Sequence, residues 1–258
     1  VVGLATLLFF SILGCLHFDI KKIIAYSTGS QLGYMCFACA NSNYAASLFH
    51  LFNHAFFKAL LFITSGVIIS HLNDLQDLRK MGGLFNVLPV SYGCFMVGIL
   101  SLNGVWFLSG FYSKDVILYG SQNPLYNHYL ILSIIINMYI LLTMMYSINL
   151  IYWIFFSPTK LNTKLYINLK ESISLDLKIA LVFLVIMSTC SGFFFKDIFL
   201  SPGSLLLSSS VYNNFDLGLI RLLRFKVPVF FFYILAGFYV SFLDFMSYNI
   251  LSTMFMYY

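Results

Sequence analysis

Charged side chains are scarce in this sequence of 258 residues. Asp, Glu, Lys and Arg together make up only 9% of it, and glutamate occurs once, at Glu171. Because a soluble domain carries about 25% charged residues, this chain cannot cover a water-facing surface. Hydrophobic residues make up 60% of the sequence. The composition therefore argues against a soluble core protein and predicts a protein that crosses a membrane several times.

Signatures of several functional classes are also missing. The net charge is +5, but no basic run is interleaved with aromatic residues, so we expect no nucleic-acid partner. There is no Walker A motif, dinucleotide-binding glycine pattern, zinc ligand set or four-cysteine cluster, so we expect no cofactor in this chain. Cys36 and Cys39 form a C-x-x-C in an apolar stretch. Metal or redox chemistry is one interpretation of this pair, and small buried hydrophobic residues are the simpler one.

Long apolar runs are abundant in place of these features. A helix needs about 20 apolar residues to cross roughly 30 Å of hydrocarbon, and lipid excludes open sheets. By that length, the sequence predicts an all-α polytopic membrane protein, with about eight transmembrane helices in one domain spanning 1–258. The expected helices lie at roughly 1–18, 22–40, 44–71, 84–103, 105–120, 126–156, 179–200 and 227–250.

Eight crossings would divide the basic loop residues between two sides of the membrane. One side would hold Lys21, Lys22, Arg79, Lys80, Lys196, Arg221, Arg224 and Lys226. The other side would hold Lys160, Lys164, Lys170 and Lys178. The side with more lysine and arginine usually faces the compartment of synthesis. Because one miscounted helix reverses this division, the sequence assigns no orientation.

The fifth run is short and interrupted. It contains Gly104, Gly110 and Gly120, and it carries Lys114 and Asp115 near its middle. A short hydrophobic segment broken by glycine, with charge at its centre, is typical of a discontinuous transmembrane helix. A plain interhelical loop at the membrane surface is the alternative. The adjacent carboxylate could hold the lysine charged and release it on movement, or the two could form a structural ion pair.

Three ionisable residues recur every fourth position in the third run, in the stretch HLFNHAFFKALLF. Four residues advance a helix by about 400°, so His50, His54 and Lys58 share one stripe about 12 Å long. A lysine facing lipid costs about 2.5–3.5 kcal/mol, so Lys58 should face the protein interior. Each histidine alone could be an ordinary core residue. Together, and with a lysine among them, they are candidates for proton transfer, because imidazole and buried lysine exchange protons readily.

The remaining ionisable residues of the runs are assigned no function. His17, Asp19 and His71 lie near helix ends and should be interfacial, and His128 should lie at a loop edge. Asp244, near the end of the last run, is ambiguous.

Four sequence blocks carry a resemblance to a known family. DIKKIIAYSTGSQLGYMCFA, LFHLFNHAFFKALLFITSGVII, DLQDLRKMGGL and GFYSKDVIL, in this order and spacing, resemble subunit 5 of mitochondrial NADH dehydrogenase. These proteins are antiporter-like subunits of respiratory complex I, related to Mrp sodium/proton antiporters. The blocks cover roughly 19–118, and a looser match, GFFFKDIF, extends to about 199. The SKD sequence favours subunit 5 over subunit 4, which carries a glutamate in the equivalent helix.

The resemblance implies a proton-translocating unit of two inverted repeats, each with a broken helix. The second antiporter-like repeat would correspond to roughly 20–156, with additional helices at 1–18, 179–200 and 227–250. His50, His54 and Lys58 would be central-axis groups, and Lys114 and Asp115 the terminal pair. Asp19 and Arg79 match charged loop positions. FMN, iron–sulfur clusters and ubiquinone would lie elsewhere in the complex, which resides in the mitochondrial inner membrane.

The chain departs from the family pattern in several places. The first repeat is missing, with its glutamate–lysine pair, so the resemblance implies that a separate chain supplies it. Further partners would be subunit 4, other membrane-arm subunits and lipids. No proline precedes GFYSKD, and Asn149 replaces a usual arginine. The excess of Phe, Tyr and Lys fits an AT-rich genome, so the chain should be organelle-encoded.

Three functions remain open from the sequence. The first is a proton-translocating part of complex I, which couples electron transfer elsewhere in the complex to pumping. The second is half of a Mrp-type sodium/proton antiporter. The third is a scaffold that only packs a membrane arm, against which the presence of Lys58, Lys114 and Asp115 in so charge-poor a chain argues.

Overall fold

The computed structural model describes residues 1–121, 129–161, 166–167 and 169–200, and within them the chain is helical. Seven of the expected runs each contain an α-helix, and the expected helix at 227–250 lies outside the described residues. Two shorter elements complete the described part, the 3-10 turn η1 and the π-helical turn η2 that continues α6. The elements are α1 (Val2–Leu16), α2 (Ile20–Ala40), α3 (Tyr44–His71), η1 (Leu78–Lys80), α4 (Pro89–Asn103), α5 (Ser109–Ser121), α6 (Tyr129–Ile151), η2 (Tyr152–Phe156) and α8 (Leu175–Leu200).

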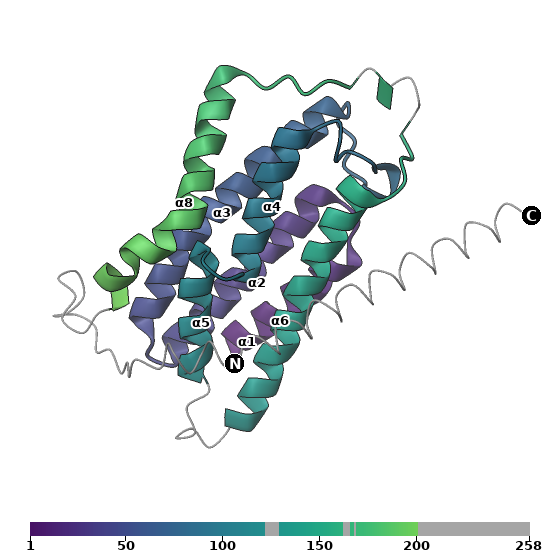
Figure 1. Ribbon diagram of the computed structural model, residues 1–258. Coiled ribbons are helices and arrows are strands. Elements are labelled where there is room, and N and C mark those ends of the chain that lie inside the picture. The colour runs from purple at the N-terminus through teal and green to yellow at the C-terminus, as the bar shows by residue number, and fades with distance from the viewer. Residues whose placement is uncertain (122–128, 162–165, 168, 201–258) are drawn as a thin grey trace, which may run out of the picture.

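The helices form a bundle in which α3 is central (Figure 1). Among the described residues, three helical segments are long and apolar enough to cross a membrane: Tyr44–His71, Ile131–Phe156 and Leu175–Leu200. α1 and α4 are apolar but shorter. These lengths, together with the hydrophobic composition, make the chain a multi-pass membrane protein.

The helices α4 and α5 are too short to cross a membrane separately. With 15 and 13 residues they extend about 22 and 20 Å at 1.5 Å per residue. Both lie along α3, one after the other: Gly98 of α4 is against Leu61, and Ser113 of α5 is beside His50. Figure 1 shows α5 continuing in the direction of α4. The runs expected at 84–103 and 105–120 therefore make one broken crossing, and the expected count of eight is too high by one over this stretch.

The break between α4 and α5 is set by backbone geometry. Gly104 ends α4 with a φ of 75°, a left-handed conformation that costs glycine nothing. Phe107 also has a positive φ, of 68°, which is unusual for a bulky residue. The connection between α4 and α5 is therefore irregular. The discontinuous helix expected from the sequence thus forms without a proline ahead of GFYSKD.

One end of the bundle, here called the loop face, carries the polar segments 17–19 and 72–88 and the described residues of 157–174. The described part of 157–174 packs on the 72–88 loop, where the Tyr166 hydroxyl donates to the Gly83 carbonyl at 3.1 Å. The backbone N–H of Ser172 donates to His71 Nε2, also at 3.1 Å. Lys160, Lys170 and Lys178 therefore share a side with Lys21, Lys22, Arg79 and Lys80, and the expected division was wrong. The physical reason is the broken helix, which was counted as two crossings.

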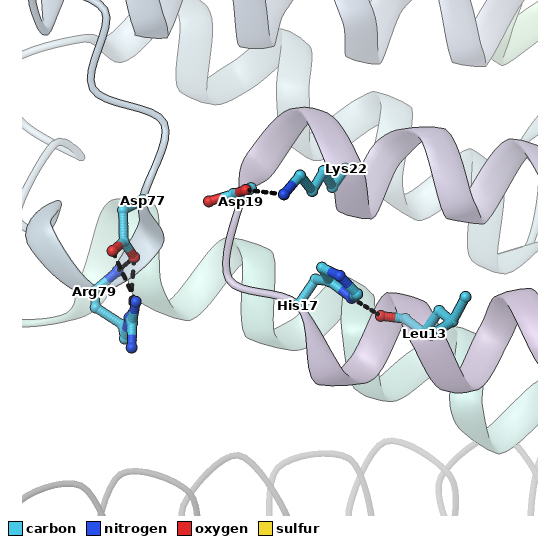
Figure 2. A network of polar contacts seen from close by, with 6 residues as sticks. All are labelled: Leu13, His17, Asp19, Lys22, Asp77 and Arg79. Carbon is cyan, nitrogen blue, oxygen red and sulfur yellow. Dashed lines mark hydrogen bonds and ion pairs between the residues drawn. The ribbon is translucent and has the colours of Figure 1, made fainter.

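The α1–α2 turn is bonded to the 72–88 loop through backbone groups. The N–H of Leu78 donates to the Phe18 carbonyl at 2.8 Å, and that of Ile20 donates to Gln76 at 3.1 Å. Asp19 pairs with Lys22 at 3.0 Å, and Asp77 pairs with Arg79 at 2.9 Å. His17 caps the end of α1 through Leu13, as Figure 2 shows.

These contacts place three residues whose location was expected from the sequence. His17, Asp19 and His71 all lie at helix ends on the loop face. Their position at helix ends is as expected, and their placement at a membrane interface stays a prediction.

Glu171 caps the first half of the broken helix. Its carboxylate accepts the backbone N–H groups of Val90 at 2.9 Å and Ser91 at 2.7 Å, and the Ser91 hydroxyl at 2.6 Å. The first N–H groups of a helix lack intrahelical partners, and a negative charge there is favoured by the helix dipole. The single glutamate of the chain thus fixes α4 to the segment that leads into α8.

Two of the three apolar clusters among the described residues lie on either side of a polar middle. The first, nearer the loop face, includes Ile24, Phe57, Leu61, Phe95 and Trp153. The second, toward the other end, includes Leu7, Tyr34, Phe37, Ile117 and Tyr139. The buried polar residues between them are the candidate site.

Candidate functional site

All five ionisable residues singled out from the sequence are buried inside the bundle. On α3, the exposed fractions are 0% for His50, 7% for His54 and 4% for Lys58, and on α5 they are 2% for Lys114 and 3% for Asp115. α3 and α5 are in direct contact. Ionisable groups at membrane depth face the protein interior because lipid exposure costs several kcal/mol, at least about 2.5.

His50 connects three helices. Its Nδ1 lies 2.9 Å from the Ser113 hydroxyl on α5, and its Nε2 lies 3.1 Å from Oε1 of Gln31 on α2. The Gln31 oxygen can only accept, so Nε2 carries a proton in either charge state of the ring. Nδ1 is then the nitrogen that gains or loses a proton, and it faces Ser113.

Ser113 can satisfy both charge states of His50. Its hydroxyl also lies 3.3 Å from the carbonyl oxygen of Ser109, one turn earlier. When the ring is neutral, the hydroxyl can donate to Nδ1, and when the ring is charged, Nδ1 donates and the hydroxyl turns to Ser109. A rotation of the Ser113 hydroxyl would therefore accompany a change in the charge state of His50.

Lys58 lies near the middle of α3 and donates from Nζ to the hydroxyl of Ser27 on α2. The Ser27 hydroxyl in turn donates a hydrogen bond to the Ile24 carbonyl oxygen at 2.7 Å. A neutral hydroxyl is a weaker partner for an ammonium group than a carboxylate is. The contact orients the lysine but stabilises its charge less than a carboxylate would.

His54 lies between His50 and Lys58 on the same stripe. Its ring centroid is 6.1 Å from that of His50. Its Nε2 is buried and has no hydrogen-bond partner among the described residues. A buried polar atom without a protein partner is a position where ordered water can bind.

Lys114 is held at the α5 end of the row. Its Nζ lies 3.4 Å from the Thr143 hydroxyl of α6 and 5.2 Å from the centre of the Tyr139 ring. Its backbone oxygen accepts the Tyr34 hydroxyl of α2 at 2.8 Å. Ser113, the neighbour of Lys114 in sequence, touches His50, so the α3 stripe and the Lys114–Asp115 pair belong to one site. We call Lys58, His54, His50, Ser113 and Lys114 the buried axis.

Several residues of the site were missed from the sequence. Ser27, Gln31, Ser113, Tyr34 and Thr143 each contact a residue of the buried axis. A signal existed for the first two: Ser27 and Gln31 are four residues apart, at the two ends of the polar stretch STGSQ in the second run. Ser113 and Thr143 carry no such pattern, because a single hydroxyl can satisfy itself on its own helix.

The C-x-x-C pair has no structural sign of metal binding. The thiol of Cys39 lies 3.3 Å from the Ser47 hydroxyl, and Cys36 is exposed on α2. Within the described ranges, no three His, Cys, Asp or Glu side chains are grouped to hold a metal ion. His128, Asp244, Lys164, Arg221, Arg224 and Lys226 lie outside the residues that the structure describes.

The chain is similar to curated proteins that share one name. NADH-ubiquinone oxidoreductase chain 5 of Dictyostelium citrinum is 44% identical over 218 residues, covering 83% of this chain and 32% of that protein. Relatives of the same name from Dictyostelium discoideum and Acanthamoeba castellanii are equally similar. The chain spans about a third of the length of these curated relatives.

Two solved membrane complexes contain chains of the same fold. A chain of the Mrp complex from a Dietzia species superposes with a TM-score of 0.64 at 17% identity, covering 80% of this chain and 48% of that chain. A chain of the membrane-bound sulfane sulfur reductase, an archaeal respiratory membrane complex, gives 0.65 at 28% identity, covering 74% and 31%. Residues 1–141 match the family described as NADH:quinone oxidoreductase/Mrp antiporter, transmembrane. With more than half of its length inside that match, the chain belongs to the NADH:quinone oxidoreductase/Mrp antiporter transmembrane family.

Proposed function

We propose that this chain is a proton-translocating part of the antiporter-like subunit 5 of respiratory complex I. Electron transfer elsewhere in the complex would drive proton movement through the buried axis. The observation that carries the proposal is the row of five residues from Lys58 to Lys114, buried on two helices and connected through His50 and Ser113. The 44% identity to chain 5 of NADH-ubiquinone oxidoreductase favours complex I over a Mrp exchanger.

The row supplies the steps that proton transfer needs. Lys58, His54 and His50 can each bind a proton, and Ser113 passes one through its hydroxyl toward Lys114 and Asp115. The 6.1 Å between the His50 and His54 rings is a distance that one water molecule bridges. Lys58 and Lys114 carry like charges in a low-dielectric interior, so charging one disfavours the charged state of the other. Conformational or electrostatic changes in the rest of the complex would then move protons by changing which of the two lysines is charged.

The assignment implies further partners and a place in the cell. A second antiporter-like repeat at roughly 20–156 would work with a first repeat, carried on the same polypeptide or on a separate one. Subunit 4, other membrane-arm subunits and lipids would surround it in the mitochondrial inner membrane. Among the described residues, seven lysines and arginines lie at the loop face and Lys196 lies at the other end of α8. The loop face should therefore be on the matrix side, where an organelle-encoded chain is made.

The test is proton pumping by the assembled complex with Lys58→Ala or Lys114→Ala. Each variant should pump at least about tenfold more slowly, which corresponds to 1.4 kcal/mol at the transition state. Lys80→Ala is the matched control, because Lys80 is exposed on the loop face. Native gels with an NADH-dehydrogenase stain report assembly, and mass spectrometry of the active band identifies the chain that supplies the first repeat. Unchanged pumping in assembled Lys58 and Lys114 variants would overturn the proposal.

The second candidate is half of a Mrp-type sodium/proton antiporter, favoured by the shared fold with the Mrp complex chain. It predicts sodium-dependent transport that is insensitive to quinone-site inhibitors. Migration of this chain apart from the NADH-dehydrogenase band, together with such transport, would replace the complex I assignment.

A further inference from the structure

We propose that Ser191 of α8 forms a water-binding pocket with Asn53 of α3 and Ser109 of α5, and that this pocket passes protons to His50. The inference rests on the proposed function of the buried axis and adds a branch to it. α8 lies outside the row of five residues, so its role would otherwise be packing alone.

A buried hydrogen bond joins α8 to α3. The Ser191 hydroxyl donates to Oδ1 of Asn53 at 2.7 Å, with exposed fractions of 1% and 0% for the two residues. Other serines and threonines of α8, such as Ser188 and Thr189, donate to carbonyl groups of α8 itself. Ser191 is thus turned away from its own helix and toward the interior.

The same turn of α8 also touches the start of α5. A Cβ placed on Gly192 would lie 2.5 Å from Cα of Ser109, so only glycine allows the two backbones to approach this closely. Ser109 is the first residue of α5, immediately after the break in the broken helix. Ser191 bonds to Asn53 and its neighbour Gly192 contacts Ser109, so α8 brings α3 and α5 together at the level of the break.

Two polar atoms in this place lack protein partners. Asn53 Nδ2 and Ser109 Oγ are both buried, and neither has a hydrogen-bond partner among the described residues. Buried polar groups in proteins are almost always hydrogen-bonded, and where protein partners are missing, ordered water takes that role. The Asn53 amide offers donors and the Ser109 hydroxyl offers both a donor and an acceptor, which is the set that a bound water needs.

The pocket connects to the buried axis through α5. Ser109 and Ser113 are one helical turn apart, and the Ser113 hydroxyl reaches the Ser109 carbonyl oxygen at 3.3 Å and His50 Nδ1 at 2.9 Å. A proton arriving on water at Ser109 is thus about one turn from the hydroxyl that faces the titrating nitrogen of His50. Ser191 acts as a positioning residue, because it fixes the Asn53 amide through its oxygen and leaves Nδ2 to bind water.

The experiment compares Ser191→Ala with Ser188→Ala in the assembled complex. Both serines are fully or almost fully buried on α8, and only Ser191 bonds to another helix, so Ser188→Ala controls for loss of a buried hydroxyl. We expect Ser191→Ala to slow proton pumping roughly fivefold, the scale of one lost hydrogen bond. The solvent deuterium isotope effect on pumping should rise, which a purely structural defect would not produce. Ser188→Ala should match the parent complex.

A second measurement keeps the inference testable if Ser191→Ala fails to assemble. A cryo-EM map of the parent complex that resolves ordered water should show water between Asn53 Nδ2 and Ser109 Oγ. Dry side-chain packing there, or a Ser191→Ala complex that pumps like Ser188→Ala, would overturn the pocket. If Lys58→Ala stops pumping while Ser191→Ala does not, this inference fails and the proposed function stands. If neither variant affects pumping, the proposed function fails as well.

Discussion

Lysines at the loop face and lysines in the buried axis are stabilised in different ways. At the loop face, Lys22 pairs with the carboxylate of Asp19 at 3.0 Å, and both side chains are more than a third exposed. In the buried axis, Lys58 is 4% exposed and donates to a serine hydroxyl. Water solvates the first pair, so its charge is permanent and contributes little to stability. The second lysine has a weak partner and no bulk water, so its charge state depends on its neighbours.

The difference teaches that, in a chain with few charged residues, the few that are buried mark the candidate site. Charged residues make up 9% of the chain, and most of those that the structure describes are exposed or partly exposed. The exceptions lie on facing sides of α3 and α5, and small polar residues of α2 and α6 surround them. Four predictions test this contrast between the buried axis and the loop face, in order of decreasing expected effect.

The largest effect is expected from Ser27→Ala. Removing the hydroxyl leaves the buried Lys58 ammonium without this acceptor, and hydrogen bonds to charged groups contribute about 1.5–3 kcal/mol. Proton pumping should therefore fall by about tenfold or more in the assembled complex. Thr28→Ala is the matched control, because Thr28 lies next in sequence, is more exposed and bonds only to its own helix. Equal pumping by the two variants would show that the hydroxyl does not serve Lys58.

Gly104→Ala should disturb the break in the broken helix. An alanine with a φ of 75° costs about 1–2 kcal/mol relative to glycine, so assembly or thermal stability should fall. Gly93→Ala is the control within α4, where an added Cβ meets nothing within 4 Å and helix propensity improves. The check is the melting temperature of the complex in mild detergent. A loss of stability with Gly93→Ala that equals the loss with Gly104→Ala would contradict the role of the left-handed glycine.

Glu171 on the loop face should show a smaller, graded effect. Glu171→Gln keeps one acceptor oxygen for the start of α4 but loses the charge, and Glu171→Ala loses both. Caps of this kind contribute about 1 kcal/mol, so Ala should destabilise more than Gln. The same thermal measurement separates the two. Identical melting temperatures for the parent, Gln and Ala complexes would exclude a capping role.

The smallest effect is expected at Asp77, and it depends on pH. Partial burial alone would raise the pKa of Asp77, but hydrogen bonds and the charge of Arg79 outweigh it and hold that pKa below its ordinary value. A carboxyl whose pKa is lower in the folded state stabilises fully above its unfolded pKa of about 3.9. This contribution is lost as the pH falls through the lowered folded pKa.

Asp77→Asn should therefore lower the melting temperature slightly at neutral pH. Below about pH 4, the melting temperature of this variant should decrease less with falling pH than that of the parent complex. Asp74→Asn is the control, since Asp74 is an exposed loop residue nearby. Parallel pH curves for the parent and Asp77→Asn complexes would show that the Asp77–Arg79 pair adds nothing measurable.

Much of the fold followed from the sequence because lipid leaves few choices. Apolar runs in a membrane must be helices, so the expected runs from 1 to 200 each contain one. The same reasoning misjudged the crossings, since run length alone cannot tell whether α4 and α5 stand side by side or end to end. Gly104 marked the break, but only the contacts of Gly98 and Ser113 with α3 showed that the two halves form one crossing. That correction moved Lys160, Lys170 and Lys178 to the loop face.

The sequence by itself determined which groups are ionisable, that they lie on helices, and that His50, His54 and Lys58 share a stripe. Helix periodicity is a local property, so it needs no tertiary information. Only the tertiary structure decided that Ser113 meets His50, that Ser27 meets Lys58 and that Ser191 meets Asn53. These contacts join residues 31 to 138 positions apart, and their geometry depends on how whole helices pack. A hydroxyl in a sequence carries no mark of which helix it will face, because its own backbone can always satisfy it instead.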